Sequence, residues 1–296
     1  MSTSHPLTSV GIVAKHHLRE AAPHLADISA WLRERGLRAV FETATAALCT
    51  PACDWPVRDK EQLVREVDMV LVLGGDGTLL GMADRIAEAG LSIPILGINF
   101  GSLGFLTEVT LPEMYPSLEA AVSGRAGVEE RLMLTSTTTR QNAAPVTRVG
   151  LNDVVITKTA RSRLIDLSVW VGEEFLTRIK GDGLIIATPT GSTAYNLAAG
   201  GPIVEPSVEA LLITPIAPHT LTNRPIVIPS TSSIRVQPLI EDRDELYITF
   251  DGQAGYQLQA GDQITVRAGE TRLRLIRPST RSHFEVLREK LKWGER

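Results

Sequence analysis

Apolar residues in the first third of the chain alternate between continuous runs and helical spacing. The runs at 9–14, 37–41, 67–73 and 93–98 have the length of buried strands. Residues 25–32, between the first two runs, place apolar side chains at offsets of three and four, as one face of a helix does. Strands that alternate with helices in this way predict a parallel sheet covered on both faces. We therefore expect a doubly wound α/β domain at the start of the chain.

The pattern changes near Gly124. From Arg131 onward most apolar runs read as strands, separated at short intervals by turn signals such as VGEE and GDG. The end of the chain, HFEVLREKLKW, returns to helical spacing. These changes predict an α/β domain at 1–125, a β-rich, β-sandwich-like domain at 126–280, and a C-terminal helix at 281–296 that packs back on the first domain.

Composition narrows the choice of partners and location. The chain has 296 residues, is 43% hydrophobic and 22% charged, and carries a formal net charge of −4 with no densely basic stretch. Nucleic acid and anionic membranes are therefore not expected partners. No apolar run approaches the roughly 20 residues of a membrane span, and the N-terminus lacks the order of a signal peptide. Cys49 and Cys53 are too few for a zinc site, so we expect two thiols in a cytoplasmic protein.

The first candidate for chemistry is GGDGT, residues 74–78, which directly follows the apolar run that ends at Leu73. Glycines at the end of a parallel strand let a ligand approach the backbone, and the helix that follows favours phosphate. The stretch matches neither the P-loop nor the dinucleotide-binding glycine pattern. Asp76 can be read as a helix cap or turn residue. It can equally be read as an ionised carboxylate that accepts a proton from a hydroxyl group.

The second candidate is the stretch from Leu184 to Pro202, LIIATPTGSTAYNLAAGGP. It reads as a strand, a turn rich in hydroxyl groups, and a short helix that begins near Thr193 and ends at two glycines and a proline. The hydroxyl groups could hold a sugar or phosphate, and the Tyr195 ring could stack on a base. A well-capped helix with a core tyrosine explains the local pattern equally well.

Three acidic positions complete the candidate set. Asn152 and Asp153 open an apolar strand, Asp182 lies in KGDG, and Asp251 lies in DGQ. Because Asp-Gly is a common hairpin signal, each of them alone could be a turn residue. Arg163 alone could be an ordinary surface charge.

Taken together these stretches resemble bacterial NAD kinases. GGDGT at 74–78, GSLGFLTE at 101–108, LNDVVI at 151–156 and DGLIIATPTGSTAYNLAAGGP at 182–202 occur in the family's order with similar spacing. GGDGT by itself is also similar to a motif of diacylglycerol, sphingosine and 6-phosphofructokinases. The combination of LNDVVI with TPTGSTAY is much more specific.

The resemblance implies an enzyme that phosphorylates the 2′-hydroxyl of the adenosine ribose of NAD. The donor would be ATP or another phosphoryl donor, with a divalent metal, Mg²⁺, carried on its phosphates rather than on protein ligands. Asp76 would be the catalytic base. The implied phosphate-binding residues are Gly74, Gly75, Gly77 and Thr78. The implied NAD-binding residues are Asp76, Gly77, Asn152, Asp153, Arg163, Lys180, Asp182, Thr193, Ala194, Tyr195, Asn196, Leu197, Ala198 and Gln253.

The sequence departs from the family pattern at two positions. Ser102 stands where the family has Asn or Arg, and Lys180 stands where Arg is expected; a lysine cannot make the planar two-point contact of a guanidinium. The resemblance also implies a homodimer or homotetramer. Two alternatives stay open: a lipid kinase of the diacylglycerol or sphingosine type, and a non-catalytic dinucleotide sensor. The intact Asp76 argues against a sensor.

Overall fold

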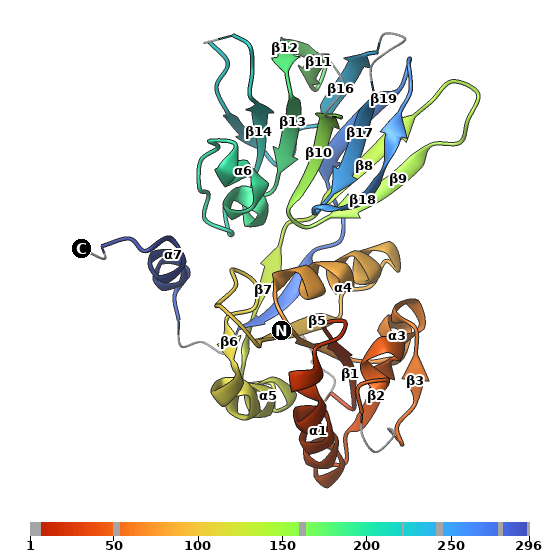
Figure 1. Ribbon diagram of the computed structural model, residues 1–296, viewed down its shortest axis with the longest axis vertical. Coiled ribbons are helices and arrows are strands. Elements are labelled where there is room, and N and C mark those ends of the chain that lie inside the picture. Colours follow the sequence, from red (N-terminus) through yellow and green to blue (C-terminus); the bar gives the residue numbers. More distant parts are fainter. Residues whose placement is uncertain are drawn as a thin grey trace. The chain divides into compact units, whose positions relative to one another are not determined.

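Buried parallel strands form the centre of the N-terminal half, as the apolar runs predict (Figure 1). The computed structural model describes residues 7–49, 54–159, 164–220, 222–240, 245–277 and 281–294. The chain divides into two compact units. Unit 1 comprises Met1–Glu130 and Leu273–Arg296, and unit 2 comprises Arg131–Arg272.

The sheet of unit 1 has the strand order β3-β2-β1-β4-β5-β20-β7, with the short β6 paired to β5. Its strands are β1 (Ser9–Ala14), β2 (Arg38–Glu42), β3 (Val57–Arg58), β4 (Met69–Leu73), β5 (Pro94–Asn99), β6 (Val109–Thr110), β7 (Gly127–Arg131) and β20 (Leu273–Arg277). The pairs β1–β2, β1–β4, β4–β5 and β5–β20 are all parallel. The direction of strand addition reverses between β1 and β4, and ligands of open α/β sheets bind beyond the carboxyl ends of strands at such a point.

Helices cover both faces of this sheet. They are α1 (Ala22–Glu34), α2 (Thr43–Ala46), α3 (Lys60–Glu66), α4 (Asp76–Glu88) and α5 (Met114–Val122), with short 3₁₀ turns at Arg19–Ala21 and Leu111–Glu113. The last helix assigned to unit 1 is α7 (His283–Leu291). Leu25 and Ile28 of α1 share a buried cluster with Leu118 of α5 and with β1 and β4. On the opposite face, Gly11 of β1 lies against Leu63 of α3. The predicted doubly wound α/β domain is confirmed.

Strand β20 differs from the sequence-based expectation. The predicted division assigns its residues, Leu273–Arg277, to the β-rich domain, whereas the structure places them in the sheet of unit 1 beside β5. The apolar alternation of TRLRLIRP identifies a strand but carries no information about which sheet it joins. That choice is made by pairing with β5, whose residues lie 180 positions earlier in the chain.

Unit 2 consists of two antiparallel six-stranded sheets, with orders β15-β14-β13-β10-β17-β18 and β12-β11-β16-β19-β8-β9. The strands are β8 (Leu134–Thr139), β9 (Val146–Gly150), β10 (Asp153–Lys158), β11 (Ile165–Val171), β12 (Glu174–Gly181), β13 (Gly183–Ala187), β14 (Ala210–Ile216), β15 (Ile226–Pro229), β16 (Ile234–Leu239), β17 (Leu246–Phe250), β18 (Gln253–Leu258) and β19 (Gln263–Ala268). Val154 and Ile156 from one sheet, and Leu167 and Val169 from the other, belong to the same core cluster. This is the packing of a β-sandwich, so the β-rich C-terminal architecture is confirmed.

Candidate functional site

GGDGT lies at the point where the strand order of unit 1 reverses. Strand β4 ends at Leu73, Gly75 is the N-cap of α4, and Asp76 is the first helical residue. Asp76 is therefore not the helix cap that local pattern allowed. A Cβ on Gly74 would lie 2.9 Å from the Thr78 hydroxyl oxygen, so the turn has no room for a side chain. The exposed Gly77 and half-buried Thr78 lie on the first turn of the helix, where the positive end of the helix dipole favours phosphate.

The Asp76 carboxylate accepts four hydrogen bonds from a loop about 30 residues away. Oδ2 accepts the Phe105 N–H at 2.8 Å. Oδ1 accepts the N–H groups of Leu106 at 3.1 Å and Thr107 at 2.9 Å, and the Thr107 hydroxyl at 2.9 Å. Because a carboxylate oxygen offers about two lone-pair positions, Oδ1 is fully occupied and Oδ2 can accept one further proton donor. Such long-range partners exclude a simple local turn role.

The loop that holds Asp76 is part of GSLGFLTE, a motif whose sequence does not indicate a contact with Asp76. A Cβ on Gly104 would lie 2.0 Å from Asp76 Oδ1, so only glycine lets the carboxylate approach this closely. The buried Asn99 stabilises the loop: its Nδ2 donates to the Ser102 carbonyl at 2.6 Å, and its Oδ1 accepts the Gly101 N–H at 2.6 Å. The Ser102 side chain is exposed, so the departure from the family pattern there leaves the loop framework intact.

A cavity of about 530 Å³ opens beside GGDGT in unit 1. Its lining includes Gly75, Gly77 and Thr78 together with three basic side chains, Lys15, His16 and Lys60. Ala14, Glu42 and Ala44 complete it. These basic residues belong to none of the motifs in the sequence. They lie after β1 and at the start of α3, and only the strand order brings them to the same edge as GGDGT.

In unit 2 the NDVVI and TPTGSTAY stretches lie against each other. Thr188 donates its N–H to the Asn152 carbonyl at 2.9 Å and its hydroxyl to the Leu151 carbonyl at 2.6 Å. A Cβ on Gly191 would lie 2.0 Å from the Asn152 carbonyl oxygen, so this close approach requires glycine. The structure thus brings together two stretches whose contact the sequence alone does not reveal.

A pair of buried carboxyl groups lies at this junction. Asp251 accepts the N–H groups of Leu151 at 2.7 Å, Asn152 at 2.7 Å and Asp153 at 3.0 Å. Burial raises the pKa of Asp251, although these three donors oppose the rise. Burial, and then the nearby charge of Asp251, raise the pKa of Asp153 to about 7. Asp251 is therefore the better-stabilised anion, and Asp153 changes its protonation state near neutral pH.

The hydroxyl-rich turn forms a 3₁₀ turn at Thr190–Thr193 followed by the four-residue helix α6 (Tyr195–Ala198). Tyr195 is 45% exposed, so it is not the core tyrosine of the alternative reading. Asn196 is fully buried: its Nδ2 donates to the carbonyls of Ser192 and Pro202, and its Oδ1 accepts the Thr214 hydroxyl at 2.6 Å. The Asn196 side chain therefore holds the turn in place.

The remaining candidates lie on strands of unit 2. The Asp182 carboxylate lies 3.4 Å from the Lys158 ammonium group, and Lys180 is exposed on β12. Gln253 is exposed at the start of β18. Arg163 lies outside the residues that the structure describes.

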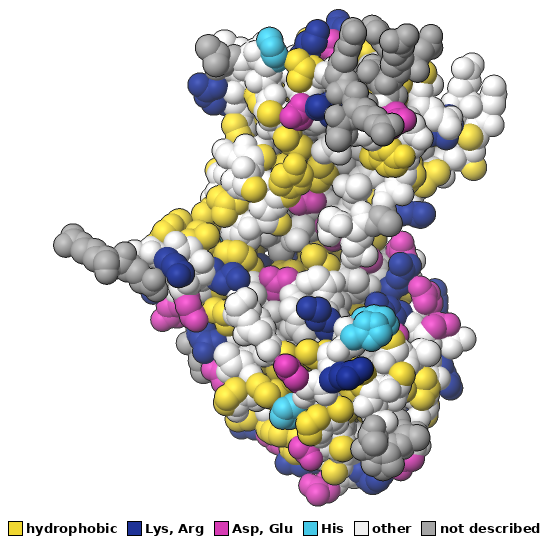
Figure 2. Space-filling model, in the orientation of Figure 1, with side chains coloured by type: hydrophobic (Ala, Val, Ile, Leu, Met, Phe, Trp, Pro, Cys, Tyr) yellow, Lys and Arg dark blue, Asp and Glu magenta, His cyan; other side chains and the backbone are white. Residues whose placement is uncertain are grey.

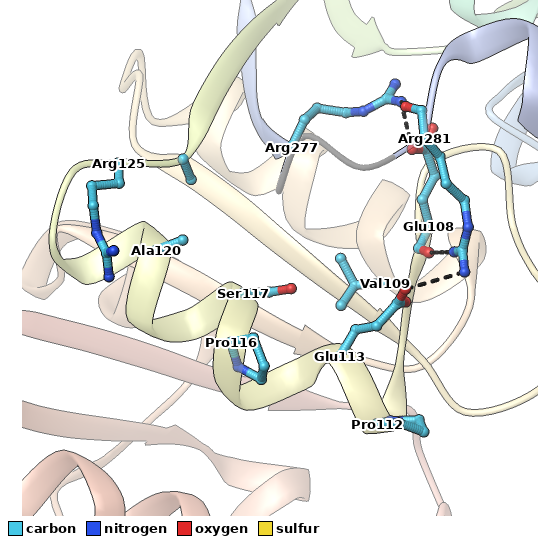
Figure 3. A pocket seen from close by; sticks show the side chains of 11 residues that line it. Glu108, Val109, Pro112, Glu113, Pro116, Ser117, Ala120, Arg125, Arg277 and Arg281 are labelled. Atoms are coloured by element: carbon cyan, nitrogen blue, oxygen red, sulfur yellow. Dashed lines mark hydrogen bonds and ion pairs between the residues drawn. The ribbon is translucent and has the colours of Figure 1, made fainter.

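A second cavity in unit 1, of about 320 Å³, differs in its electrostatics (Figure 3). Arg277 pairs with Glu108 at 2.6 Å, and Arg281 pairs with Glu113 at 3.1 Å. The Arg281 guanidinium also donates to the Glu108 carbonyl at 2.8 Å. Two of the three guanidinium groups that line this cavity are thus already paired with carboxylates, and the third, on Arg125, donates to the Ser123 hydroxyl at 2.9 Å.

The chain matches two domain families in succession. Residues 10–126 match the ATP-NAD kinase N-terminal domain, and residues 151–278 match the ATP-NAD kinase C-terminal domain. The chain belongs to the NAD kinase family. It is 47% identical to the NAD kinase of Geobacter sulfurreducens, over 98% of this chain and 100% of that one. It is 44% identical to the NAD kinase of Geotalea daltonii, with the same coverage of both chains.

Two solved structures share the fold of this family member. Yeast NADH kinase complexed with NADH superposes with a TM-score of 0.89 and 26% identity, covering 98% of this chain and 89% of the yeast chain. An NAD kinase from Archaeoglobus fulgidus in complex with ATP gives a TM-score of 0.75 and 26% identity, covering 95% and 99%. The family resemblance predicted from the motifs is confirmed.

The surface of this NAD kinase family member agrees with its composition. Basic and acidic side chains are interspersed over the face shown in Figure 2, in keeping with the net charge of −4. None of the helices in the described part of the chain is both long enough and apolar enough to cross a membrane.

Proposed function

We propose that this protein is an NAD kinase that transfers a phosphoryl group to the 2′-hydroxyl of the adenosine ribose of NAD and so forms NADP. Membership of the family supports the activity. One observation carries the chemistry: the Asp76 carboxylate is held by four hydrogen bonds at the N-terminus of α4, and its Oδ2 can accept one more donor.

Asp76 acts as the base in this proposal. The 2′-hydroxyl donates to Oδ2, and the proton moves to that oxygen as the ribose oxygen attacks the terminal phosphorus of the donor. The bond from this phosphorus to the bridging oxygen breaks, and the rest of the donor (ADP where the donor is ATP) leaves with the electron pair. In a loose phosphoryl-transfer transition state, orienting the hydroxyl matters as much as basicity. The loop at 105–107 fixes the rotation of the carboxylate, so the accepting oxygen does not have to be ordered during the reaction.

The donor is ATP or another compound with a phosphate chain, bound at Gly74, Gly75, Gly77 and Thr78. The cavity beside these residues supports this position. The A. fulgidus NAD kinase was solved in complex with ATP, which supports ATP as the donor. Among the described residues no group of three or more His, Cys, Asp or Glu is arranged to hold a metal ion. A Mg²⁺ ion held by the donor phosphates and water, without protein ligands, would fit the donor site, and it would neutralise charge on the phosphates.

The NAD-binding residues of unit 2 are proposed from the contacts around Asn152 and Asp153. With a pKa near 7, Asp153 can either donate or accept a hydrogen bond with the nucleoside at neutral pH. Lys180 and Asp182, together with Tyr195 and Gln253, present half-buried or exposed side chains that a dinucleotide can reach. Asn196 supports this site indirectly, since its side chain is already satisfied within the protein.

The test is to incubate the protein with ATP, Mg²⁺ and NAD and to detect NADP with an NADP-specific dehydrogenase. The Asp76→Asn variant should bind NAD but lose at least about 100-fold in kcat, the usual contribution of general-base catalysis. Asp27→Asn, on the exposed surface of α1, is the matched control and should keep the parent rate. If no donor gives NADP above a blank, the enzyme assignment fails. Phosphorylation of diacylglycerol or sphingosine instead would favour the lipid kinase alternative.

Two further features are proposed on the family resemblance alone. We expect a homodimer or homotetramer, which sedimentation of the purified chain would reveal. We also place the enzyme in the cytoplasm, where its substrates are available.

A further inference from the structure

We infer that Lys15 and Lys60 bind the phosphate chain of the phosphoryl donor and supply the positive charge that a P-loop lysine supplies in other kinases. The inference rests on the proposed donor site beside GGDGT. Both side chains line that cavity together with Gly75, Gly77 and Thr78.

Lys15 is fixed at the end of β1. Its N–H donates to the Leu73 carbonyl at 2.8 Å, which ties it to the last residue of β4. Its Cβ would lie 3.0 Å from a Cβ built on Gly74, so its backbone packs directly on the glycine turn. The Lys15 side chain is exposed and free to reach a ligand in the cavity.

Lys60 approaches the same helix from α3. The Asp59 carboxylate caps α3 by accepting the Gln62 N–H at 2.7 Å, which fixes Lys60 as the first helical residue. Its ammonium group lies 3.8 Å from a Cβ built on Gly81 of α4. Gly81 follows Gly77 by four residues, so the two share one face of α4. Lys60 therefore lies over the face of α4 that carries the exposed Gly77.

The charges in this cavity are available to a ligand. Among the residues that the structure describes, no carboxylate forms an ion pair with Lys15 or Lys60. The cavity contains one carboxylate, Glu42, which is 7% exposed and accepts both the N–H and the hydroxyl of Thr45. With two ammonium groups and one carboxylate that is already hydrogen-bonded, the cavity favours an anionic ligand. Arg277 and Arg281 in Figure 3 contrast with this, because each is paired with a glutamate.

The chemistry identifies the ligand class as a nucleoside triphosphate or another chain of phosphates. Two lysines on separate elements can contact two successive phosphate groups, which a single phosphate or sulfate could not bridge as well. Charge that develops on the leaving phosphate during transfer would be stabilised by the same two groups. GGDGT then needs no lysine of its own.

The test compares Lys60→Met and Lys15→Met with the parent enzyme. Each variant should raise the KM for ATP by roughly 10- to 100-fold, the range for losing a hydrogen bond to a charged group. The KM for NAD should stay within about twofold, and Lys60→Arg should recover most of the affinity, since it restores the charge. Arg65→Met removes one positive charge from the exposed side of the same α3 helix and should behave as the parent.

Calorimetric titration with ATP, without NAD, measures binding independently of turnover. The inference is overturned if both lysine variants keep the ATP affinity and KM of the parent within twofold while remaining folded by circular dichroism. A parent protein that binds ATP but forms no NADP would defeat the proposed function and leave this measurement valid. Equal losses of ATP affinity in Lys60→Met and Arg65→Met would show a general charge effect and would also overturn the inference.

Discussion

Asp76 and Thr107 are joined by two hydrogen bonds, although 31 positions separate them in the chain. The N–H and the hydroxyl of Thr107 both donate to Asp76 Oδ1, each at 2.9 Å. The Thr107 hydroxyl oxygen also lies 3.3 Å from Nδ2 of the buried Asn99, which donates to it. This chain of contacts leaves Oδ2 as the oxygen with a free acceptor position. The orientation of the proposed base is thus set by the loop, not by the glycine turn that carries it.

The Thr107→Val variant tests that orientation. It keeps the shape of the side chain but removes the hydroxyl, so we expect kcat to fall by about tenfold with little change in either KM, because misplaced catalytic groups cost rate. Thr107→Ser restores the hydroxyl and should recover most of the rate. Steady-state kinetics of both variants, with ATP or NAD varied while the other is saturating, measure kcat and the two KM values. A Thr107→Val enzyme with the parent kcat would show that the Thr107 hydroxyl is not needed to orient Asp76.

The Gly104→Ala variant tests the close approach of Gly104 to the Asp76 carboxylate. The added methyl group would lie 2.0 Å from Asp76 Oδ1, so the carboxylate or the loop must move, and we expect at least about 100-fold loss of kcat. Gly101→Ala is the matched control in the same loop, since the nearest atom to its methyl group is 3.8 Å away. Comparable rates for the two variants would contradict the geometry.

The buried Asp153 predicts a dependence of stability on pH. Its pKa is raised from 3.8 to about 7, so between these values the folded state holds a proton that the unfolded state has released. The free energy of unfolding therefore falls as pH rises from about 4 to 7. Asp153→Asn removes this effect, so the variant should gain stability relative to the parent across that range, on the order of 1–4 kcal/mol. Urea unfolding of both proteins at several pH values measures this difference in stability. A difference that does not change with pH would refute the raised pKa of Asp153.

The buried ion pair between Arg277 and Glu108 predicts a loss of stability. Both side chains are 10% exposed, and Arg277 belongs to β20. Arg277→Met leaves the Glu108 charge buried without this partner, which costs about 3–5 kcal/mol in such pairs. Arg33→Met, in the exposed pair with Asp54, should cost about 1 kcal/mol or less. Urea unfolding of both variants checks the contrast, and equal losses would show that burial of the pair adds nothing.

Much of the architecture could be read from local patterns. The run from Met69 to Leu73 is a fully buried strand, and the helical offsets at 25–32 do mark a buried helix face. These features depend on residues close together in the chain, whose spacing decides which side chains share a face. The position of β20 could not be read in this way, because an alternating strand carries no record of the sheet it joins.

The sequence by itself determined the two kinds of domain, the glycine turn after β4 and the family. Only the tertiary structure decided what surrounds the proposed site residues. It brought the loop at 105–107 to Asp76, Asp251 to Asp153, and Lys15 and Lys60 to one cavity. Each of these groups joins residues between 29 and 98 positions apart. Their approach depends on strand order and sheet pairing, which the local spacing of apolar and polar residues does not encode.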